Sequence, residues 1–180
     1  MGKLLSLGWR TAESQSLRYD ILSKITDFAG KTILEPGCGY GDFLNFINNK
    51  IEIQKYTGID IMKSFLQNIP ETYRNSSNIN FISGDFSKMN FSNYDTVIAS
   101  GFISYKVFDN NYYLKMISKM FEISNEVVGF NFLDSEKFGK HPIIKSHNKD
   151  DIIKHCKSLT SNLKIIEDYL PDDVTIVLYK

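Results

Sequence analysis

The stretch EPGCGYG (residues 35–41) decides the fold, because it continues directly from the apolar run KTILE (residues 31–35). The run is short and aliphatic, which is typical of a buried strand. The three glycines allow a sharp turn and let a ligand approach the backbone closely. A helical pattern follows over 42–49. Strand, glycine loop and helix in this order predict one unit of a sheet that binds a ligand beyond the carboxyl ends of its strands.

Outward from this loop, strands and helices alternate along the whole chain. Helical spacing of apolar residues is found at 11–28, 42–49, 63–69, 111–124 and 150–159. Segments typical of strands lie at 31–35, 55–60, 79–83, 95–100, 126–132, 163–167 and 174–179. We expect Thr11 to cap the first helix, with Ser14 in a capping box, and Gly30 to end it.

The last two strand segments are separated by only 168–173, which is too short for a helical crossover. They must therefore pair as an antiparallel hairpin. Apolar strands that alternate with helices predict a parallel sheet covered on both faces. The expected fold is α/β, with a mostly parallel seven-stranded sheet and an antiparallel last strand.

The length of 180 residues predicts one domain over 1–180. The net charge is zero, with 21 basic and 21 acidic residues, which argues against a protein built to grip nucleic acid or an anionic membrane. Cys38 and Cys156 lie far apart and outside any metal-binding spacing, so we expect no metal and no disulfide framework. The start of the chain lacks signal-peptide features, and no run is long enough to span a bilayer. The expected compartment is the cytoplasm.

The charges around the glycine loop favour a cationic ligand over a dinucleotide. A dinucleotide motif reads G-x-G-x-x-G, but Asp42 stands where its third glycine would be, and Glu35 precedes the loop. Carboxylates at both ends of the loop would repel a pyrophosphate. S-adenosylmethionine carries no phosphate, and its ammonium and sulfonium groups are cationic. The sign of the charge therefore predicts S-adenosylmethionine as the cofactor, with S-adenosylhomocysteine as its product.

The other strand ends supply groups for the rest of a nucleoside. Asp60 ends the second strand and can accept hydrogen bonds from a ribose diol, and Ile61 can pack on the adenine face. After the third strand, Asp85 can accept from the adenine amino group beside Phe86. Ser100 ends the fourth strand, where a small residue leaves room for the methionine part of the cofactor.

These motifs together resemble a known family. EPGCGYG, GID (58–60), SGDF (83–86) and YDTVIASG (94–101) are similar, in this order and spacing, to class I S-adenosylmethionine-dependent methyltransferases. The segments 8–22 and 168–180 resemble a subgroup of small bacterial methyltransferases of mostly unassigned substrate. The resemblance implies a Rossmann-like three-layer sandwich. It also implies cofactor contacts from Glu35, Asp60 and Asp85.

In such enzymes the segment before the first strand, here 1–30, covers the cofactor as a lid. Trp9, Gln15 and Arg18 lie on it, and charge complementarity suggests that Arg18 reaches the methionine carboxylate. An equal alternative is that Arg18 forms a surface salt bridge with Glu13 or Asp20. The full set of expected cofactor residues is Trp9, Gln15, Arg18, Glu35, Gly37, Cys38, Gly39, Gly41, Asp60, Ile61, Asp85, Phe86 and Ser100, with Cys38 chosen for its small size.

The methyl acceptor is expected to be a small molecule attacked at oxygen or nitrogen. The Pro-Pro-aromatic motif of amino-group methyltransferases that act on nucleic acid is absent after the fourth strand. The connection 134–149 leaves the ligand edge and can cover the acceptor. Candidate catalytic residues are His141, Asn131 and Tyr105, although His141 can be a bystander and Asn131 can merely satisfy backbone groups. Asp172 and Asp173 are interpreted as turn-forming residues around Pro171.

Three other functions stay open at this point. The chain can be an inactive cofactor-binding module, an NAD-dependent oxidoreductase, or a methyltransferase that acts on protein or nucleic acid. The missing third glycine weighs against the oxidoreductase, and the neutral charge weighs against nucleic acid. The residues do not specify an oligomeric state.

Overall fold

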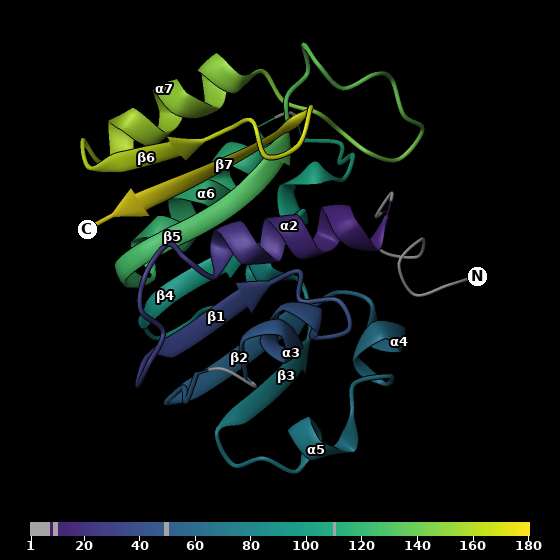
Figure 1. Cartoon of the computed structure of the whole chain (residues 1–180), viewed down its shortest axis with the longest axis vertical. Helices are drawn as coiled ribbons and strands as arrows, with labels where there is room; N and C mark the ends of the chain where they lie inside the picture. Colours follow the sequence, from purple (N-terminus) through teal and green to yellow (C-terminus); the bar gives the residue numbers. More distant parts are fainter. Residues whose placement is uncertain (1–7, 9–10, 49–50, 110) are drawn as a thin grey trace.

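The computed structural model describes residues 8, 11–48, 51–109 and 111–180. Seven strands form one sheet in the order β3-β2-β1-β4-β5-β7-β6 (Figure 1). Their bounds are β1 Thr32–Pro36, β2 Lys55–Asp60, β3 Ile79–Ser83, β4 Tyr94–Ala99, β5 Ser124–Leu133, β6 Leu163–Ile166 and β7 Asp173–Tyr179. The helices are α2 Ala12–Leu22, α3 Asp42–Asn48, α4 Lys63–Leu66, α5 Glu71–Arg74, α6 Tyr112–Glu122 and α7 Lys149–Leu159, with short 3₁₀ turns η1 Phe86–Lys88 and η2 Phe102–Ser104.

The strand directions confirm the predicted sheet. β1 pairs in parallel with β2 and β4, and the parallel ladder continues to β3 and β5. β7 inserts between β5 and β6 and is antiparallel to both. The carboxyl ends of β1 to β6 therefore point to one edge of the sheet, and the turn before β7 lies at that same edge.

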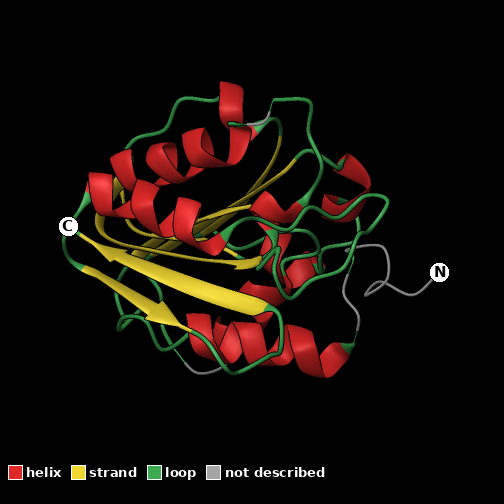
Figure 2. Ribbon diagram, turned by 90° about the horizontal axis from the view of Figure 1, so that it is seen from above, coloured by secondary structure: helices red, strands yellow, loops and turns green. Residues whose placement is uncertain are grey.

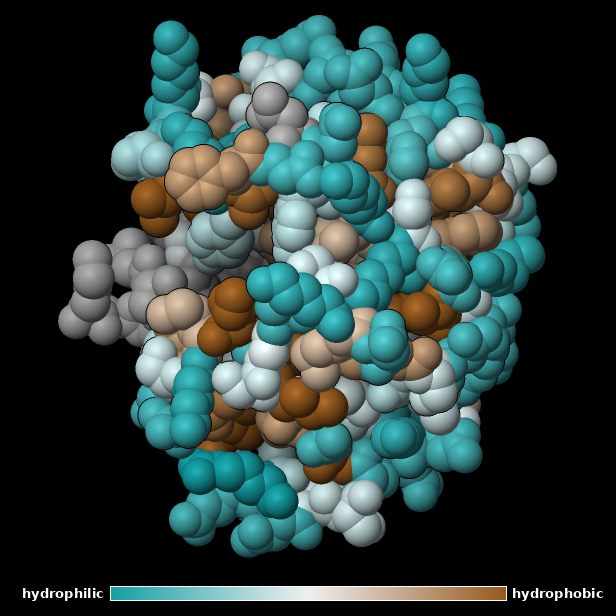
Figure 3. Space-filling view, turned by 180° about the vertical axis from the view of Figure 1, so that it is seen from behind, coloured by the Kyte–Doolittle hydropathy of each residue, from teal (hydrophilic) through white to brown (hydrophobic). Residues whose placement is uncertain are grey.

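Helices cover both faces of the sheet, which gives the expected three-layer sandwich (Figure 2). On one face, α2, α3 and α5 pack on a cluster that includes Ile33, Tyr56 and Ile98. On the other, α6 and α7 pack on a cluster that includes Val97 and Phe130. Seen from behind, the surface is mostly hydrophilic, with apolar residues in small separate patches (Figure 3). None of the helices in the described part of the chain is long and apolar enough to cross a membrane.

Two helix predictions were wrong in extent. The first helix begins as expected, with reciprocal capping between Thr11 and Ser14, but it ends at Leu22 instead of near residue 28. Ile25 and Phe28 are buried although they lie after the end of the helix. The apolar spacing therefore indicated that these side chains are buried, and not that the helix continues. The predicted helix 63–69 covers only Lys63–Leu66, and a separate turn, α5, follows Pro70. Proline lacks the amide hydrogen that a continuous helix would need there.

Gly58 in β2 tests how tightly the glycine loop packs on the sheet. A Cβ at this position would lie 2.8 Å from the Cys38 Sγ and 2.8 Å from the Phe81 ring. We expect Gly58→Ala to lower the free energy of unfolding by about 1–3 kcal/mol, because a buried ring and the loop must both shift. Urea unfolding measures the change. Gly139→Ala is the matched control, since a Cβ there meets nothing within 4 Å. Equal stability of the two variants would contradict the packing.

Candidate functional site

A cavity of about 890 Å³ lies at the carboxyl edge of the sheet. Its wall is built from the ends of β1, β2, β4 and β5, from the loop after β3, and from the turn between β6 and β7. Helix α2 and the segment 138–144, which lie far apart in the sequence, complete it. This volume is in the range of cavities that bind drug-sized ligands and cofactors.

Most residues predicted to bind the cofactor meet at this cavity. Those that line it are Arg18, Glu35, Gly37, Cys38, Gly39, Asp60, Ile61, Asp85, Phe86 and Ser100, and the acceptor-side candidates Tyr105 and His141 line it too. Gln15, Gly41 and Asn131 are not part of its wall. Trp9 lies outside the described residues.

The glycine loop is held against β2 by backbone hydrogen bonds. The amides of Gly37 and Cys38 both donate to the Ile59 carbonyl, at 2.7 and 3.0 Å. Gly37 has a φ of 71°, and a Cβ there would lie 2.9 Å from the Phe102 ring. This position therefore requires glycine. A Cβ at Gly41 would instead lie 3.2 Å from the Phe81 ring, so this glycine lets the start of α3 pack closely on the sheet.

Glu35 places a buried carboxyl group directly below this loop. It is 2% exposed and accepts a hydrogen bond from the Tyr56 hydroxyl. Burial raises the pKa of Glu35 to about 8, against the lowering effect of the Tyr56 hydrogen bond, and the nearby charges of Asp42 and Asp60 raise it further. Without a cation in the cavity, Glu35 is thus mostly protonated near neutral pH. A cationic ligand would favour its ionised form.

Asp60 fixes the end of β2 relative to the loop. Its Oδ2 accepts the Gly39 amide at 2.9 Å, and its Oδ1 accepts the Met62 amide at 2.8 Å. Burial raises the pKa of Asp60 above its usual range. The next residue, Ile61, is 68% exposed on the cavity wall, so an apolar side chain stands beside the carboxylate with its face open.

The loop after β3 is held by hydrogen bonds from Lys119, a residue that the sequence analysis did not identify. Asp85 caps η1 by accepting from the Ser87 amide, and the Ser87 hydroxyl holds the pKa of Asp85 below its usual range. The Lys119 ammonium of α6 donates to the carbonyls of Phe86, Ser87 and Met89 at 2.6–3.1 Å. The same ammonium lies 5.0 Å from the centre of the Phe86 ring. The cavity-facing position of Phe86 is therefore set by α6.

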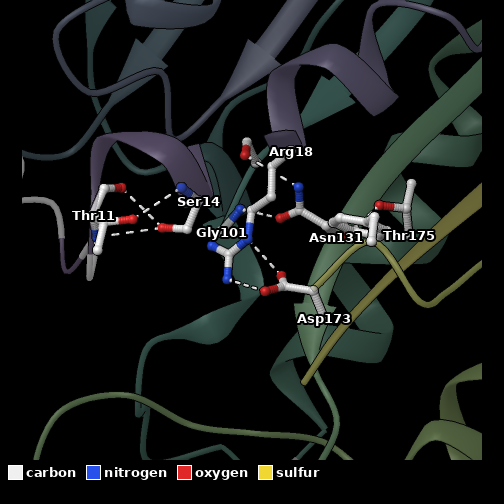
Figure 4. Close-up of polar contacts among 9 residues, drawn as sticks. Thr11, Ser14, Arg18, Gly101, Asn131, Asp173 and Thr175 are labelled. Carbon is white, nitrogen blue, oxygen red and sulfur yellow. Dashed lines mark hydrogen bonds and ion pairs between the residues drawn. The ribbon is translucent and has the colours of Figure 1, made fainter. Parts of the chain in front are cut away.

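Arg18 pairs with a residue that the sequence interpretation assigned only to a turn. Its Nη2 donates to Asp173 Oδ2 at 2.7 Å, and its Nε lies 2.5 Å from Oδ1 (Figure 4). Asp20, one of the two partners considered from the sequence, pairs with Lys24, whereas Arg18 pairs with Asp173. The two partners are 155 residues apart, so no local pattern could reveal the contact.

Two predicted site residues have structural roles instead of lining the cavity. The Gln15 amide donates to Asp42 Oδ2 at 3.2 Å and to the Tyr19 hydroxyl at 3.1 Å. Asn131 is 1% exposed; its Oδ1 accepts the Gly101 amide at 2.8 Å and its Nδ2 donates to the Ser100 hydroxyl at 3.2 Å. Asn131 thus shapes the turn after β4, which agrees with the alternative that it satisfies backbone groups.

His141 lines the cavity, but its hydrogen bonds argue against a general base. Its Nδ1 accepts the backbone amides of Ile144 at 3.0 Å and Ile143 at 3.4 Å. The neutral ring must then carry its proton on Nε2, which makes that nitrogen a donor. Tyr105 also faces the cavity, and burial raises the pKa of its hydroxyl, so it stays protonated. His147 and His155 lie off the cavity wall, bonded to the Ile103 carbonyl and the Ser118 hydroxyl.

The part of the cavity wall around Tyr105 and His141 includes apolar residues that the sequence only partly predicted. Residues 138–141 and Ile144, from the connection 134–149, line the cavity, and Tyr105 forms an antiparallel bridge with Ile144. Wall residues that were not predicted are Phe102, Val107, Leu133, Leu170 and Pro171. They carry no recognisable motif, and only the fold brings them together.

Comparisons with known proteins agree with this geometry. A family model described as a methyltransferase domain matches residues 33–126, which is more than half of the chain. The search of curated proteins found no match to the sequence of this chain.

Solved methyltransferases share the fold at low identity. The magnesium protoporphyrin IX methyltransferase from Synechocystis PCC 6803, with bound SAH, is 14% identical, with 93% of this chain and 83% of that chain covered and a TM-score of 0.71. The N-methyltransferase NodS from Bradyrhizobium japonicum WM9, in complex with S-adenosyl-L-homocysteine, is 17% identical, with 92% and 84% covered and a TM-score of 0.66. A putative S-adenosylmethionine-dependent methyltransferase from Listeria monocytogenes is 15% identical, with 92% and 99% covered and a TM-score of 0.67.

The matched region holds the glycine loop and the ends of β1 to β4, where the cavity-lining carboxylates Glu35, Asp60 and Asp85 lie. Family, fold and site thus point the same way. The chain belongs to the methyltransferase domain family and is a class I S-adenosylmethionine-dependent methyltransferase.

Proposed function

We propose that this methyltransferase binds S-adenosylmethionine in the cavity at the carboxyl edge and transfers its methyl group to the oxygen or nitrogen of a small-molecule acceptor. The observation that carries the proposal is the convergence of Glu35, Asp60 and Asp85, from three different strand ends, on one cavity beside a glycine loop. Three carboxylates suit a ligand that brings positive charge and hydrogen-bond donors, and they disfavour one that brings phosphates.

The residues present fit the cofactor group by group. Asp60 would accept from the ribose hydroxyls and Asp85 from the adenine amino group, with Ile61 and Phe86 as apolar contacts of the base. Glu35 lies beneath the Gly37–Gly39 turn, where its carboxylate would balance the cationic amino acid end. Arg18 would bind the methionine carboxylate, and Ser100 leaves room beside it. Cys38 acts as a small packing residue, because its buried thiol has a raised pKa and stays protonated.

When bound, the cofactor supplies a methyl group on a positively charged sulfur, which an acceptor can displace in line. The chain's residues then need mainly to align the acceptor and exclude water. The apolar wall of Phe138, Leu170 and Pro171 supports both tasks for a small organic acceptor. The Nε2–H of His141 would donate a hydrogen bond to it. Because the protonated Nε2 of His141 cannot remove a proton from the acceptor, the site favours acceptors whose attacking atom is already unprotonated at working pH.

The first test is calorimetric titration with S-adenosylmethionine, S-adenosylhomocysteine and NAD. We expect both adenosyl ligands to bind and NAD not to bind. Asp60→Ala should weaken binding at least tenfold, since it removes the acceptor of the ribose diol and loosens the Gly39 amide. Asp20→Ala, which removes an exposed carboxylate paired with Lys24, is the control and should change nothing. Binding of NAD in place of the adenosyl ligands would refute the proposal.

Glu35 makes cofactor binding depend on protons. Because its pKa is about 8 in the ligand-free protein, a bound cation that lowers this pKa should release close to one proton at pH 7. Calorimetry of S-adenosylhomocysteine binding in two buffers of different ionisation enthalpy measures the release. Glu35→Gln should abolish it. Buffer-independent heats in the unsubstituted protein would show that no cation binds near Glu35.

The same raised pKa predicts the pH dependence of stability. The folded value of about 8 exceeds the ordinary value of 4.5, so between these two pH values the folded state holds a proton that the unfolded state has lost. The contribution of Glu35 to stability is therefore full below about pH 4.5 and declines up to about pH 8, by at most about 1.4 kcal/mol per pH unit. Urea unfolding of Glu35→Gln beside the unsubstituted protein should isolate this slope, and parallel curves would contradict it.

Arg18 is tested with a ligand that lacks the carboxylate. Arg18→Lys keeps a charge for Asp173 but loses the planar pair of donors that matches a carboxylate. We expect S-adenosylhomocysteine to bind about tenfold more weakly, and 5′-methylthioadenosine, which has no amino acid end, to bind as before. Calorimetry gives both affinities. An equal loss for both ligands would remove Arg18 from the carboxylate site.

A further inference from the structure

The Arg18–Asp173 ion pair is buried and bridges the two ends of the chain. The side chain of Arg18 is 13% exposed and that of Asp173 is 2% exposed. Both residues line the cavity, Arg18 from α2 and Asp173 from the first position of β7 (Figure 4). Nη2 of the guanidinium donates a hydrogen bond to Oδ2, and Nε lies 2.5 Å from Oδ1 in the ion pair, so one edge of the guanidinium faces the carboxylate.

A buried ion pair is a costly way to hold two elements together. Removing both charges from water opposes the gain from their attraction, and well-packed apolar residues usually stabilise a contact as well or better. Apolar neighbours are available, because Asp173 stands opposite Leu133 in the sheet and precedes the buried Val174. The pair therefore points to a need for charge at this place in the cavity.

The first turns of α2 depend on polar contacts for their position. Between Thr11 and Arg18 the only large apolar side chain is Leu17, which is 41% exposed. The helix packs into the core only from Tyr19 onward. Gln15, bonded to Asp42 at the start of α3, and Arg18, bonded to Asp173, hold this half of the helix from two sides.

Asp173 is itself held firmly by the sheet. It pairs in register with Leu133 at the end of β5, and the Asp134 amide donates to the Asp172 carbonyl at 2.9 Å. Tyr169 in the same turn bonds the Thr175 hydroxyl at 2.8 Å. The carboxylate of Asp173 therefore has a fixed place from which it can orient a side chain on the less anchored helix.

We infer that Asp173 is a positioning residue that holds the Arg18 guanidinium at the cavity wall in the orientation that binds the carboxylate of the cofactor. The inference rests on the proposed binding of an S-adenosyl ligand in this cavity. It also means that the Arg18–Asp173 contact fixes the position of α2, on the cofactor side, relative to the turn before β7, on the acceptor side. Asp173 acts through Arg18 and does not touch the reacting atoms.

The test compares charge removal with charge exchange. Asp173→Asn keeps the shape of the side chain and removes its charge, and we expect S-adenosylhomocysteine to bind about tenfold more weakly by calorimetry. The affinity for 5′-methylthioadenosine, which lacks the carboxylate, should stay within twofold. Glu167→Gln, which removes the charge from a partly buried ion pair with Lys149 away from the cavity wall, is the matched control and should leave both affinities unchanged.

The exchanged pair Arg18→Asp with Asp173→Arg separates a positioning role from a purely structural one. The exchange restores an ion pair, so the melting temperature should recover relative to Asp173→Asn, but the cation now stands on β7 and the affinity for S-adenosylhomocysteine should stay low. Recovery of affinity together with stability would overturn the inference. So would unchanged affinity in Asp173→Asn while the unsubstituted protein binds, which would leave the proposed function intact. Failure of the unsubstituted protein to bind S-adenosylhomocysteine would refute the proposed function and the inference with it.

Discussion

The common direction of β1 to β5 is the constraint on which the site depends. Parallel strands must return through crossovers on the faces of the sheet, so all their carboxyl ends meet at one edge. Residues that are 25 positions apart in sequence, such as Glu35, Asp60 and Asp85, therefore line one cavity. The antiparallel β7 adds to this arrangement, because its short hairpin turn brings Asp173 to the same edge without another crossover.

Charge gives this edge its chemistry. Glu35 is buried and accepts a hydrogen bond from the Tyr56 hydroxyl, and burial raises its pKa to about 8, so a positive charge in the cavity would favour its ionised form. A group with such a shift marks a functional site more often than a structural one. The acidic groups of the cavity explain why a glycine loop that partly resembles the dinucleotide-binding motif favours a ligand without phosphates.

The helices behind the sheet position the site as much as the loops that form it. Lys119 of α6 fixes the loop of Asp85 and Phe86 through three carbonyls, and the Phe86 ring packs edge-on against Phe102, which fills the space beside Gly37. Gln15 and Arg18 of α2 reach to α3 and β7. These contacts hold the end of the cavity at the glycine loop and η1, while the end at residues 138–144 and the turn before β7 is built from loops, where this fold is free to vary.

The sequence by itself determined the order of strands and helices, the antiparallel last strand and the edge of the sheet where the cavity lies. These follow from short-range signals: apolar runs of five to seven residues, glycines in a loop, and acids placed directly after strands. Only the tertiary structure decided that the first helix stops at Leu22, that Gln15 and Asn131 hold neighbouring segments, and that Arg18 meets Asp173. The physical reason is that a side chain's partner depends on which distant segments the sheet brings together. A carboxylate in a turn has the same local pattern whether it faces water or a buried guanidinium.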